Sequence, residues 1–329
     1  MPLLQVSNLR VRLNTSRGAA DAVRGVSFAL ERGETLGLIG ESGCGKSLTA
    51  LALLGLLPES AVVTGSIRFN GEELVGRSDA EMCRLRGNRI GIVFQEPMTA
   101  LNPLHMIGHQ VAEPLRLHQG LSQAAARKEA VALLTRVGLP DAARRVEAYP
   151  HQLSGGQRQR VTIAMALACG PDLLIADEPT TALDVTIQGQ ILDLIAELVA
   201  ERGMALLLIS HDLGVIAENV SRMLVMYGGT IVESGPTGAV FGRMAHPYTQ
   251  GLFAARPKLG AAPGTRLATI AGTVPELVDL PPGCPFTERC RLAVAACRDT
   301  APPAVVIGAE HEARCLRIDE ALAAPLEPA

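Results

Sequence analysis

Short, continuous runs of apolar residues recur along the chain and predict strands buried in a parallel sheet. A run of this kind is typical of a strand that is covered on both faces. After the first run, Ser47–Leu57 is rich in Leu and Ala and predicts a helix that ends before Pro58. Strands and a helix in this order indicate an α/β core. The runs are 36–39, 90–94, 173–176 and 204–209.

Between these runs the pattern changes character. Residues 1 to about 95 are β-rich and include a strand at Thr64–Asn70 with a turn at Asn70-Gly71. From about 96 to 152 the pattern is helical, and Leu121–Val137 is amphipathic and ends at Gly138. The α/β pattern then resumes from 153 to about 235.

Beyond Gly235-Pro236 the content of Pro and Ala rises, and cysteines gather. We therefore expect a first domain over 1–235, with a helical subdomain at about 96–152, and a C-terminal extension over 236–329.

The composition excludes some classes of protein. The chain has 329 residues, of which 48% are hydrophobic and 3% aromatic, so Leu, Val, Ile and Ala must fill the core. A net charge of −3 gives no support for a nucleic-acid surface. No apolar run approaches the ~18 residues that span a bilayer, and no leader segment is expected at the N-terminus. Any link to a membrane is therefore expected to run through partner proteins.

The sequence after the first strand matches the phosphate-binding loop G-x-x-x-x-G-K-[ST]. Glycines let the backbone curl so that several N–H groups point at one centre, and the helix N-terminus adds its positive end. We expect Lys46 to contact the β- and γ-phosphates of ATP and the Ser47 hydroxyl to ligate Mg²⁺. Cys44, beside Lys46, is either a thiol of lowered pKa or a small variable loop residue. The candidate nucleotide-binding residues are Gly40, Glu41, Ser42, Gly43, Cys44, Gly45, Lys46 and Ser47.

Two adjacent acids follow the apolar run 173–176. The C-terminal ends of strands are where α/β sheets bind their ligands. Asp177 is therefore a candidate Mg²⁺ ligand, and Glu178 a candidate to orient and polarise the attacking water, because phosphoryl transfer depends mostly on positioning and charge neutralisation. The alternative is that both acids only cap the next helix.

A second motif, Leu153–Gln157, resembles the signature sequence of ATP-binding-cassette (ABC) ATPases. The order of the other motifs extends this resemblance: Gln95 matches the Q-loop glutamine, His211 the switch histidine and Thr181–Asp184 the D-loop. The resemblance implies that Gln95 senses Mg²⁺ and the attacking water, and that His211 contacts the γ-phosphate. The signature residues that face a partner's nucleotide are then Ser154, Gly155, Gly156 and Gln157.

The resemblance also implies the fold and the assembly. The fold is that of a P-loop NTPase cassette, with a RecA-like core, an antiparallel β subdomain and an α-helical subdomain. Two cassettes pair head to tail and enclose ATP between the phosphate loop of one and the signature of the other. One stretch departs from the family, because Arg17–Val23 lacks the aromatic residue on which many cassettes stack adenine. Adenine then rests on aliphatic groups, or nucleotide selectivity is loose.

The C-terminal extension resembles one subfamily of importers. His246–Leu252 is similar to the H-P-Y-T-x-x-L segment of oligopeptide and dipeptide importer cassettes, and the cysteines that follow complete the similarity. Four thiolates suit a [4Fe–4S] cluster or a zinc site. The absence of tight C-x₂₋₄-C pairs favours the cluster, and zinc, unligated thiols and a substitute ligand at His311 remain open. The four cysteines are Cys284, Cys290, Cys297 and Cys315.

These features predict the ATPase subunit of an ABC importer for di- or oligopeptides. The resemblance implies a position on the cytoplasmic face of the inner membrane and three kinds of partner. These are two permease subunits, a second cassette that is a paralogous chain, and an extracytoplasmic substrate-binding protein. Nickel, glutathione or another small solute is an alternative cargo. A soluble ABC ATPase without a transport role, or a module that senses ATP without turnover, is a different class. Tandem cassettes or basic arms would favour the soluble ABC ATPase. The presence of Glu178 and His211 argues against a module that senses ATP without turnover.

Overall fold

The computed structural model describes residues 1–181, 183–256 and 269–326. The chain forms two compact units, each made of segments that are distant in the sequence. The first unit comprises Met1–Leu3, Leu30–Thr35 and Gly76–Ile209, and the second comprises Leu4–Ala29, Leu36–Val75 and Ser210–Ala329.

Parallel strands form the centre of the first unit. Strand β7 (Leu173–Asp177) pairs with β6 (Ile90–Val93) on one side and with β8 (Ala205–Ser210) on the other. Every residue of β7 and β8 is buried. The prediction of buried parallel strands from the apolar runs is therefore confirmed, although β6 ends at Val93 and leaves Phe94 exposed.

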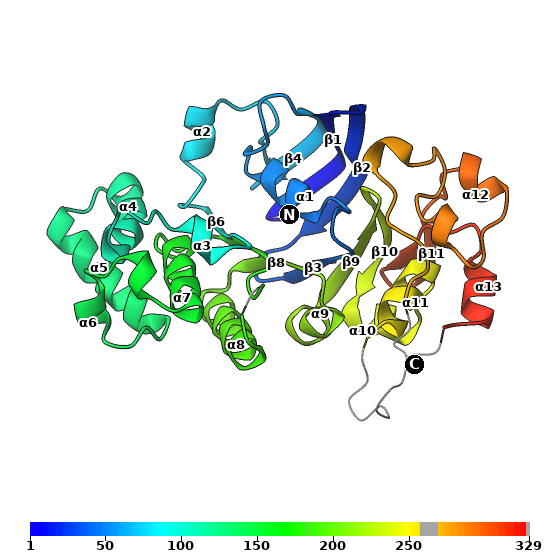
Figure 1. The fold of residues 1–329 in the computed structure, drawn as a ribbon. Coiled ribbons are helices and arrows are strands. Elements are labelled where there is room, and N and C mark those ends of the chain that lie inside the picture. Colours follow the sequence, from blue (N-terminus) through cyan, green and yellow to red (C-terminus); the bar gives the residue numbers. More distant parts are fainter. Residues whose placement is uncertain (182, 257–268, 327–329) are drawn as a thin grey trace. The chain divides into compact units, whose positions relative to one another are not determined.

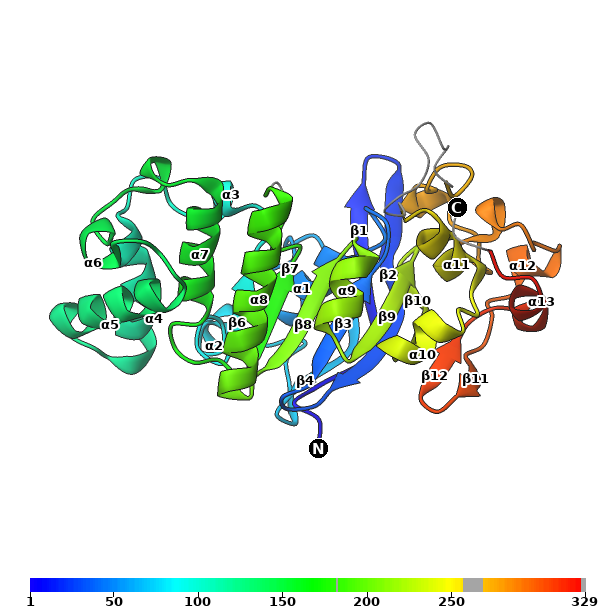
Figure 2. The ribbon, with the colours of Figure 1, turned by 90° about the horizontal axis from the view of Figure 1, so that it is seen from below.

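A group of helices follows β6 in the first unit (Figure 2). Helix α4 packs against both α5 and α7. The amphipathic segment Leu121–Val137 is confirmed as α5, which begins after the N-cap Ser122 and buries Ala126, Ala130 and Leu134 along one face. The helices and turns of this unit are α2 (Asp79–Cys83), α3 (Pro97–Ala100), α4 (Ile107–Gln119), α5 (Gln123–Arg136), α6 (Ala142–Arg145), η1 (Pro150–Gln152), α7 (Gly155–Ala166) and α8 (Val185–Arg202).

The second unit contains an antiparallel sheet of strand order β2-β1-β4-β5. The strand predicted at Thr64–Asn70 is confirmed as β4, and the turn follows at Asn70 and Gly71, which both have positive φ. Alternating burial along β1 shows that one face of the sheet packs on the core. The strands are β1 (Leu4–Thr15), β2 (Gly18–Leu30), β4 (Val62–Phe69) and β5 (Glu72–Glu73).

The second unit also holds β3 (Thr35–Ile39), which pairs in parallel with β9 (Arg222–Tyr227). Strand β10 (Thr230–Pro236) runs antiparallel to β9 (Figure 1). A hairpin of β12 (His311–Ala313) and β11 (Val305–Gly308) continues the pairing (Figure 2). The C-terminal region therefore adds strands to the sheet that contains β3.

Short helices complete the second unit. The predicted helix Ser47–Leu57 is present as α1 but ends at Leu53, before a turn at Leu54 and Gly55. None of the helices among the described residues has the length and apolarity that a bilayer span requires. The helices and turns are α1 (Lys46–Leu53), α9 (Leu213–Asn219), α10 (Thr237–Gly242), α11 (Pro247–Ala254), η2 (Leu277–Asp279), η3 (Thr287–Arg289), α12 (Ala296–Asp299) and α13 (Ile318–Ala323).

Candidate functional site

The phosphate loop lies between β3 and α1, in the strand–turn–helix context that the sequence predicts. Two of its glycines, Gly43 and Gly45, have φ values of 81° and 103°, which L-residues with side chains rarely adopt. At Gly40 the restriction is steric, because a Cβ atom would lie 2.2 Å from the carbonyl oxygen of Met226. The loop therefore requires glycine at these positions.

Lys46 is held inside the curl of this loop. Its side chain is buried, and its Nζ donates to the carbonyl oxygens of Gly40 at 2.7 Å and Glu41 at 3.1 Å. The loop thus concentrates an ammonium group, backbone N–H groups and the N-terminus of α1 at one point. This arrangement suits an anionic phosphate.

Cys44 is buried in the same loop. Burial raises the pKa of its thiol, and the nearby Lys46 only partly opposes this effect. Of the two sequence-based interpretations, the lowered pKa is therefore wrong: the thiol is a small packing group. Its backbone carries a structural contact, because the Cys44 carbonyl accepts a hydrogen bond from Gly229 N at 3.0 Å.

The C-terminal region contacts the phosphate loop directly at Glu41. The backbone N–H of Glu41 donates to the Tyr248 hydroxyl at 2.8 Å. The Glu41 carboxylate accepts from Arg289 Nη1 at 2.6 Å and from Nη2 at 3.1 Å, and only 4% of the Arg289 side chain is exposed. Although burial opposes its charge, hydrogen bonds to Glu41 and Tyr227 raise the pKa of Arg289 overall. The sequence singled out the H-P-Y-T segment but assigned no role to Tyr248 or Arg289.

The first unit brings Gln95 and Thr181 into contact with Glu178, the predicted catalytic acid. Gln95 Nε2 donates to Glu178 Oε2 at 3.0 Å, and Thr181 Oγ1 donates to the same oxygen at 3.1 Å. Glu178 has a φ of 46°, unusual for a residue with a side chain, and its N–H donates to the Ile209 carbonyl. These hydrogen bonds hold Glu178 in a rare backbone conformation and fix the direction of its carboxylate. Rare backbone conformations of this kind are common at functional sites.

Asp177 is the last residue of β7 and is buried. Its position at the carboxyl end of a central parallel strand is where such sheets bind ligands. Asp184 caps the next helix, since its Oδ1 accepts from Ile187 N at 3.0 Å. The helix cap therefore comes from Asp184, and the alternative that Asp177 and Glu178 serve only as caps has no support. Of the D-loop segment Thr181–Asp184, Ala182 lies outside the described residues.

The signature segment begins helix α7. Ser154 is the N-cap and accepts from Gln157 N at 3.4 Å, while Gln157 Oε1 accepts from Ser154 N at 3.2 Å, which forms a capping box. Arg145 Nη1 also donates to Gln157 Oε1 at 2.8 Å. A Cβ at Gly156 would lie 2.8 Å from Ile187 Cγ2, so a larger side chain would disturb the approach of α7 to α8. The segment thus presents a rigid helix N-terminus.

The remaining predicted residues lie in the second unit, on two separate segments. Ser47 belongs to the first turn of α1. His211 is exposed between β8 and α9, and Asp212, next to it, caps α9 by accepting from Gly214 N at 2.7 Å.

The four tail cysteines lie near one another in the second unit. Burial raises the pKa of the Cys284 thiol to about 12, and electrostatic interaction with Cys315, Cys290 and Cys297 adds to the rise. Burial likewise raises the pKa of Cys315 to about 11. Among the described residues, however, no three His, Cys, Asp or Glu side chains are arranged to hold a metal ion. His311 Nε2 instead lies 2.9 Å from Glu233 Oε1, so this nitrogen is engaged with a buried carboxyl group.

Two family models match the chain. The model described as "ABC transporter" covers residues 23–181, and the model described as "Oligopeptide/dipeptide transporter, C-terminal region" covers residues 232–297. A dipeptide transport ATP-binding protein of Bacillus subtilis is 48% identical over 97% of this chain and 95% of its own length. The chain belongs to the ABC ATP-binding proteins of the oligopeptide/dipeptide family.

Other relatives agree with this assignment. A Brucella melitensis protein is 50% identical over 97% of this chain and 98% of its own length. That protein is named as a peptide import ATP-binding protein. Among solved structures, a dimeric ATP-binding cassette in a post-hydrolysis state with ADP and Pi is similar, with a TM-score of 0.64 and 29% identity over 71% of this chain and 98% of its own. The expected ABC cassette fold is therefore confirmed.

Membership of the family gives the phosphate loop its chemistry. ABC ATP-binding proteins bind and hydrolyse ATP, and the phosphate loop of this chain lies within the matched region. Tyr248 and Arg289 lie in the second matched region and contact Glu41, which lies in the first. The C-terminal region of this subfamily therefore reaches the ABC phosphate loop.

Proposed function

We propose that this chain is the ATPase subunit of an ABC importer that carries di- or oligopeptides. One observation carries the proposal: a cassette in which Gln95 holds the Glu178 carboxylate is continuous with a region that matches oligopeptide/dipeptide transporters. The relatives described above are named for peptide import and dipeptide transport. These names favour peptides over nickel or glutathione as the cargo.

In the proposed reaction, Glu178 orients and polarises the water that attacks the γ-phosphate of ATP. Gln95 and Thr181 support this role, because both donate to Glu178 Oε2 and so fix the direction of its other oxygen. Lys46 neutralises charge on the β- and γ-phosphates, and His211 donates to the γ-phosphate. Phosphoryl transfer needs mainly such positioning and charge neutralisation.

A magnesium ion fits the oxygen-rich donors of this cassette. The Ser47 hydroxyl, the Asp177 carboxylate and the Gln95 amide are the hard ligands that Mg²⁺ prefers. The position of Asp177 at the carboxyl end of β7 supports this assignment, since that end of a parallel strand is where such sheets bind ligands. When bound, the ion neutralises charge on the β- and γ-phosphates.

Hydrolysis in this proposal requires two cassettes. The N-terminus of α7, with Ser154, Gly155, Gly156 and Gln157, would face the nucleotide held by the partner's phosphate loop. The dimeric state of a structurally similar cassette supports this arrangement. We propose that the second cassette is a paralogous chain.

The proposal places the chain on the cytoplasmic face of the inner membrane. Two permease subunits would form the pathway, and an extracytoplasmic binding protein would deliver the peptide. Closure around ATP would pull on the permeases through the region near Gln95 to Leu104, where Met98 and Leu104 are exposed apolar side chains. ATP drives such a cycle only if it binds the closed state more tightly than the open one.

We further propose that the four tail thiols hold a [4Fe–4S] cluster rather than zinc. The proposal rests on two features: Cys290, Cys297 and Cys315 lie near enough to Cys284 to contribute to its raised pKa, and the four cysteines lack the tight C-x₂₋₄-C pairs that zinc sites usually have. A bound cluster would supply the positive charge that makes buried thiols ionise. Iron and acid-labile sulfide in anaerobically purified protein support this assignment, whereas about one zinc per chain, or no metal, contradicts it.

The transport proposal is tested by tagging the chain in its native cell and identifying what co-purifies from gently solubilised membranes. Two polytopic permeases and a second cassette are the expected partners. Ribosomes or nucleic acid in their place would contradict the proposal and favour a soluble ABC ATPase.

A further inference from the structure

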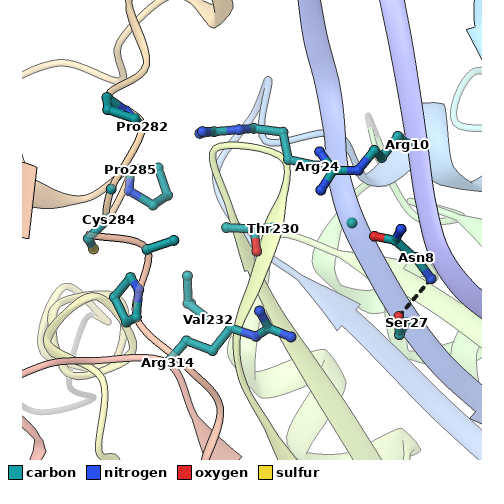
Figure 3. A pocket seen from close by; sticks show the side chains of 14 residues that line it. Asn8, Arg10, Arg24, Ser27, Thr230, Val232, Pro282, Cys284, Pro285 and Arg314 are labelled. Atoms are coloured by element: carbon teal, nitrogen blue, oxygen red, sulfur yellow. Dashed lines mark hydrogen bonds between the residues drawn. The ribbon is translucent and has the colours of Figure 1, made fainter. Parts of the chain in front are cut away.

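A polar pocket in the second unit lies between the antiparallel sheet and the C-terminal region (Figure 3). Its volume is about 400 Å³. Arg10 and Arg24 approach from β1 and β2, Thr230 lies on β10, and Pro282, Cys284 and Pro285 line the opposite side. Arg314, which follows β12, contributes a third guanidinium group. None of these residues belongs to the phosphate loop.

The lining of this pocket carries positive charge without a matching acid. No Asp or Glu is among the described residues that line it. In the part of the chain that the structure describes, neither Arg10 nor Arg314 forms an ion pair. Asp21 is close enough to interact with Arg10 and Arg24, but its carboxylate is bound by Arg12 Nε at 2.7 Å. The positive charge of the pocket is therefore largely uncompensated.

Arg24 adds a second observation that points to a ligand. Its Nη2 donates to the Pro281 carbonyl at 3.0 Å, whereas its Nη1 is buried and has no hydrogen-bond partner among the described residues. A buried donor without a partner costs about 1–3 kcal/mol. Burial lowers the pKa of this guanidinium, and repulsion from Arg10 contributes, against attraction from Asp21. An anion in the pocket would accept a hydrogen bond from Nη1 and would also balance the positive charge that burial and Arg10 disfavour.

We propose that this pocket binds a small anion that carries two or more phosphate negative charges, such as a diphosphate group. Guanidinium forks match phosphate oxygens in geometry and charge, and three of them suit a multiply charged ligand. A volume of about 400 Å³ lies within the range of small-molecule sites. The Thr230 side chain, beside them in Figure 3, offers a hydroxyl donor. The site is additional to the ATP site and to the proposed transport function.

The pocket is connected to the phosphate loop through the backbone. Arg24 N donates to the Gly229 carbonyl at 2.7 Å, and Gly229 N donates to the Cys44 carbonyl at 3.0 Å. A Cβ at Gly229 would lie 2.7 Å from the Ala22 carbonyl, so this crossing is tightly packed. An anion that orders Arg24 would therefore also steady the strand that supports the loop.

The test is a calorimetric titration of pyrophosphate into the full chain with Lys46→Ala, which weakens binding at the phosphate loop. Binding should persist in this background, and adding Arg24→Gln or Arg314→Gln should weaken it at least tenfold. Arg314→Gln is the safer variant, because Arg24 also holds Pro281. Arg298→Gln is the matched control, since Arg298 is exposed in the same region and does not line the pocket. Thermal unfolding checks that each variant is folded.

A second arm separates free phosphates from lipid headgroups. The same proteins are sedimented with vesicles that contain phosphatidic acid. Loss of pyrophosphate binding in the pocket variants supports a free anion, and loss of vesicle binding supports a headgroup. The proposal is overturned if the Lys46→Ala protein binds neither probe, or if the pocket variants bind both as tightly as Arg298→Gln.

Discussion

Arg289, which immediately precedes Cys290, forms a two-pronged ion pair with Glu41 inside the phosphate loop. The two residues are separated by 248 positions in the sequence. Because the Arg289 side chain is almost fully buried, the pair fixes the loop and the turn η3 in one arrangement. The C-terminal region is thereby part of the structure that shapes the ATP site.

Breaking this pair should destabilise the chain and weaken ATP binding. Arg289→Leu leaves Glu41 without its partner, and we expect a loss of about 1–3 kcal/mol of stability, less than for a fully buried pair because Glu41 is partly exposed. Denaturant unfolding and ATP titration measure the two effects. Arg298→Leu breaks the exposed pair with Glu288 and should cost less than about 1 kcal/mol. Equal effects of the two variants would refute a special role for Arg289.

Glu178→Gln should abolish turnover while leaving ATP binding intact. The amide keeps the shape of the side chain but is a poor base, so we expect hydrolysis to fall by at least about 100-fold. ATP should then accumulate in a closed dimer that gel filtration separates from the monomer. Glu147→Gln, an exposed change on the same unit, is the control. Unchanged turnover in Glu178→Gln would show that another group activates the water.

Acidification should destabilise the C-terminal region through His246. This residue is fully buried, and burial lowers its pKa from 6.5 to about 4, so the folded state favours the neutral ring. Between these values the unfolded chain binds more protons, and stability should fall as the pH drops from about 6.5 to about 4, by about 3 kcal/mol in total.

The matched control for this pH effect is His246→Asn. His246 Nδ1 accepts from Tyr248 N at 3.1 Å as the N-cap of α11, and an Asn oxygen can replace that acceptor without titrating. The melting temperature of the variant should depend less on pH in this range. The same pH dependence in both proteins would assign the effect to other groups.

Glu233 should be the most sensitive acid of the second unit. Its buried carboxyl group accepts from Ala245 N at 2.7 Å and His246 N at 3.0 Å and contacts His311 Nε2. Glu233→Gln places an amide NH₂ group where two backbone N–H donors and a histidine nitrogen converge, so we expect a loss of about 2–4 kcal/mol. Glu312→Gln, on an exposed face of the paired strand β12, should change little. Denaturation midpoints compare the two, and similar midpoints would contradict this role.

Local motifs predicted the cassette well because their physical requirements are local. Glycine is required in the phosphate loop by the positive φ angles of Gly43 and Gly45 and by the close approach of Gly40 to the Met226 carbonyl. Continuous apolar runs predicted the buried strands. Amphipathic spacing predicted the helix at Gln123–Arg136, which Ser122 caps. In each case the signal and the structure occupy the same short segment.

The long-range contacts left no such signal. Nothing around Arg289 distinguishes it from an exposed arginine until the fold brings Glu41 to it. The hairpin of β11 and β12 was not expected, because its strands are short and their pairing with β10 depends on the burial of Glu233 and His311. At Cys44 the sequence left two interpretations open, and burial decides between them, since desolvation raises the pKa of the thiol more than the neighbouring Lys46 lowers it.

The central claim is that ATP hydrolysis by this chain drives the uptake of peptides, and proteoliposomes test it most directly. The purified complex is reconstituted with its binding protein, and the accumulation of labelled di- and oligopeptides is measured with and without ATP. The account predicts ATP-dependent peptide accumulation that Glu178→Gln abolishes. Hydrolysis without peptide accumulation, or accumulation that persists in Glu178→Gln, would contradict it.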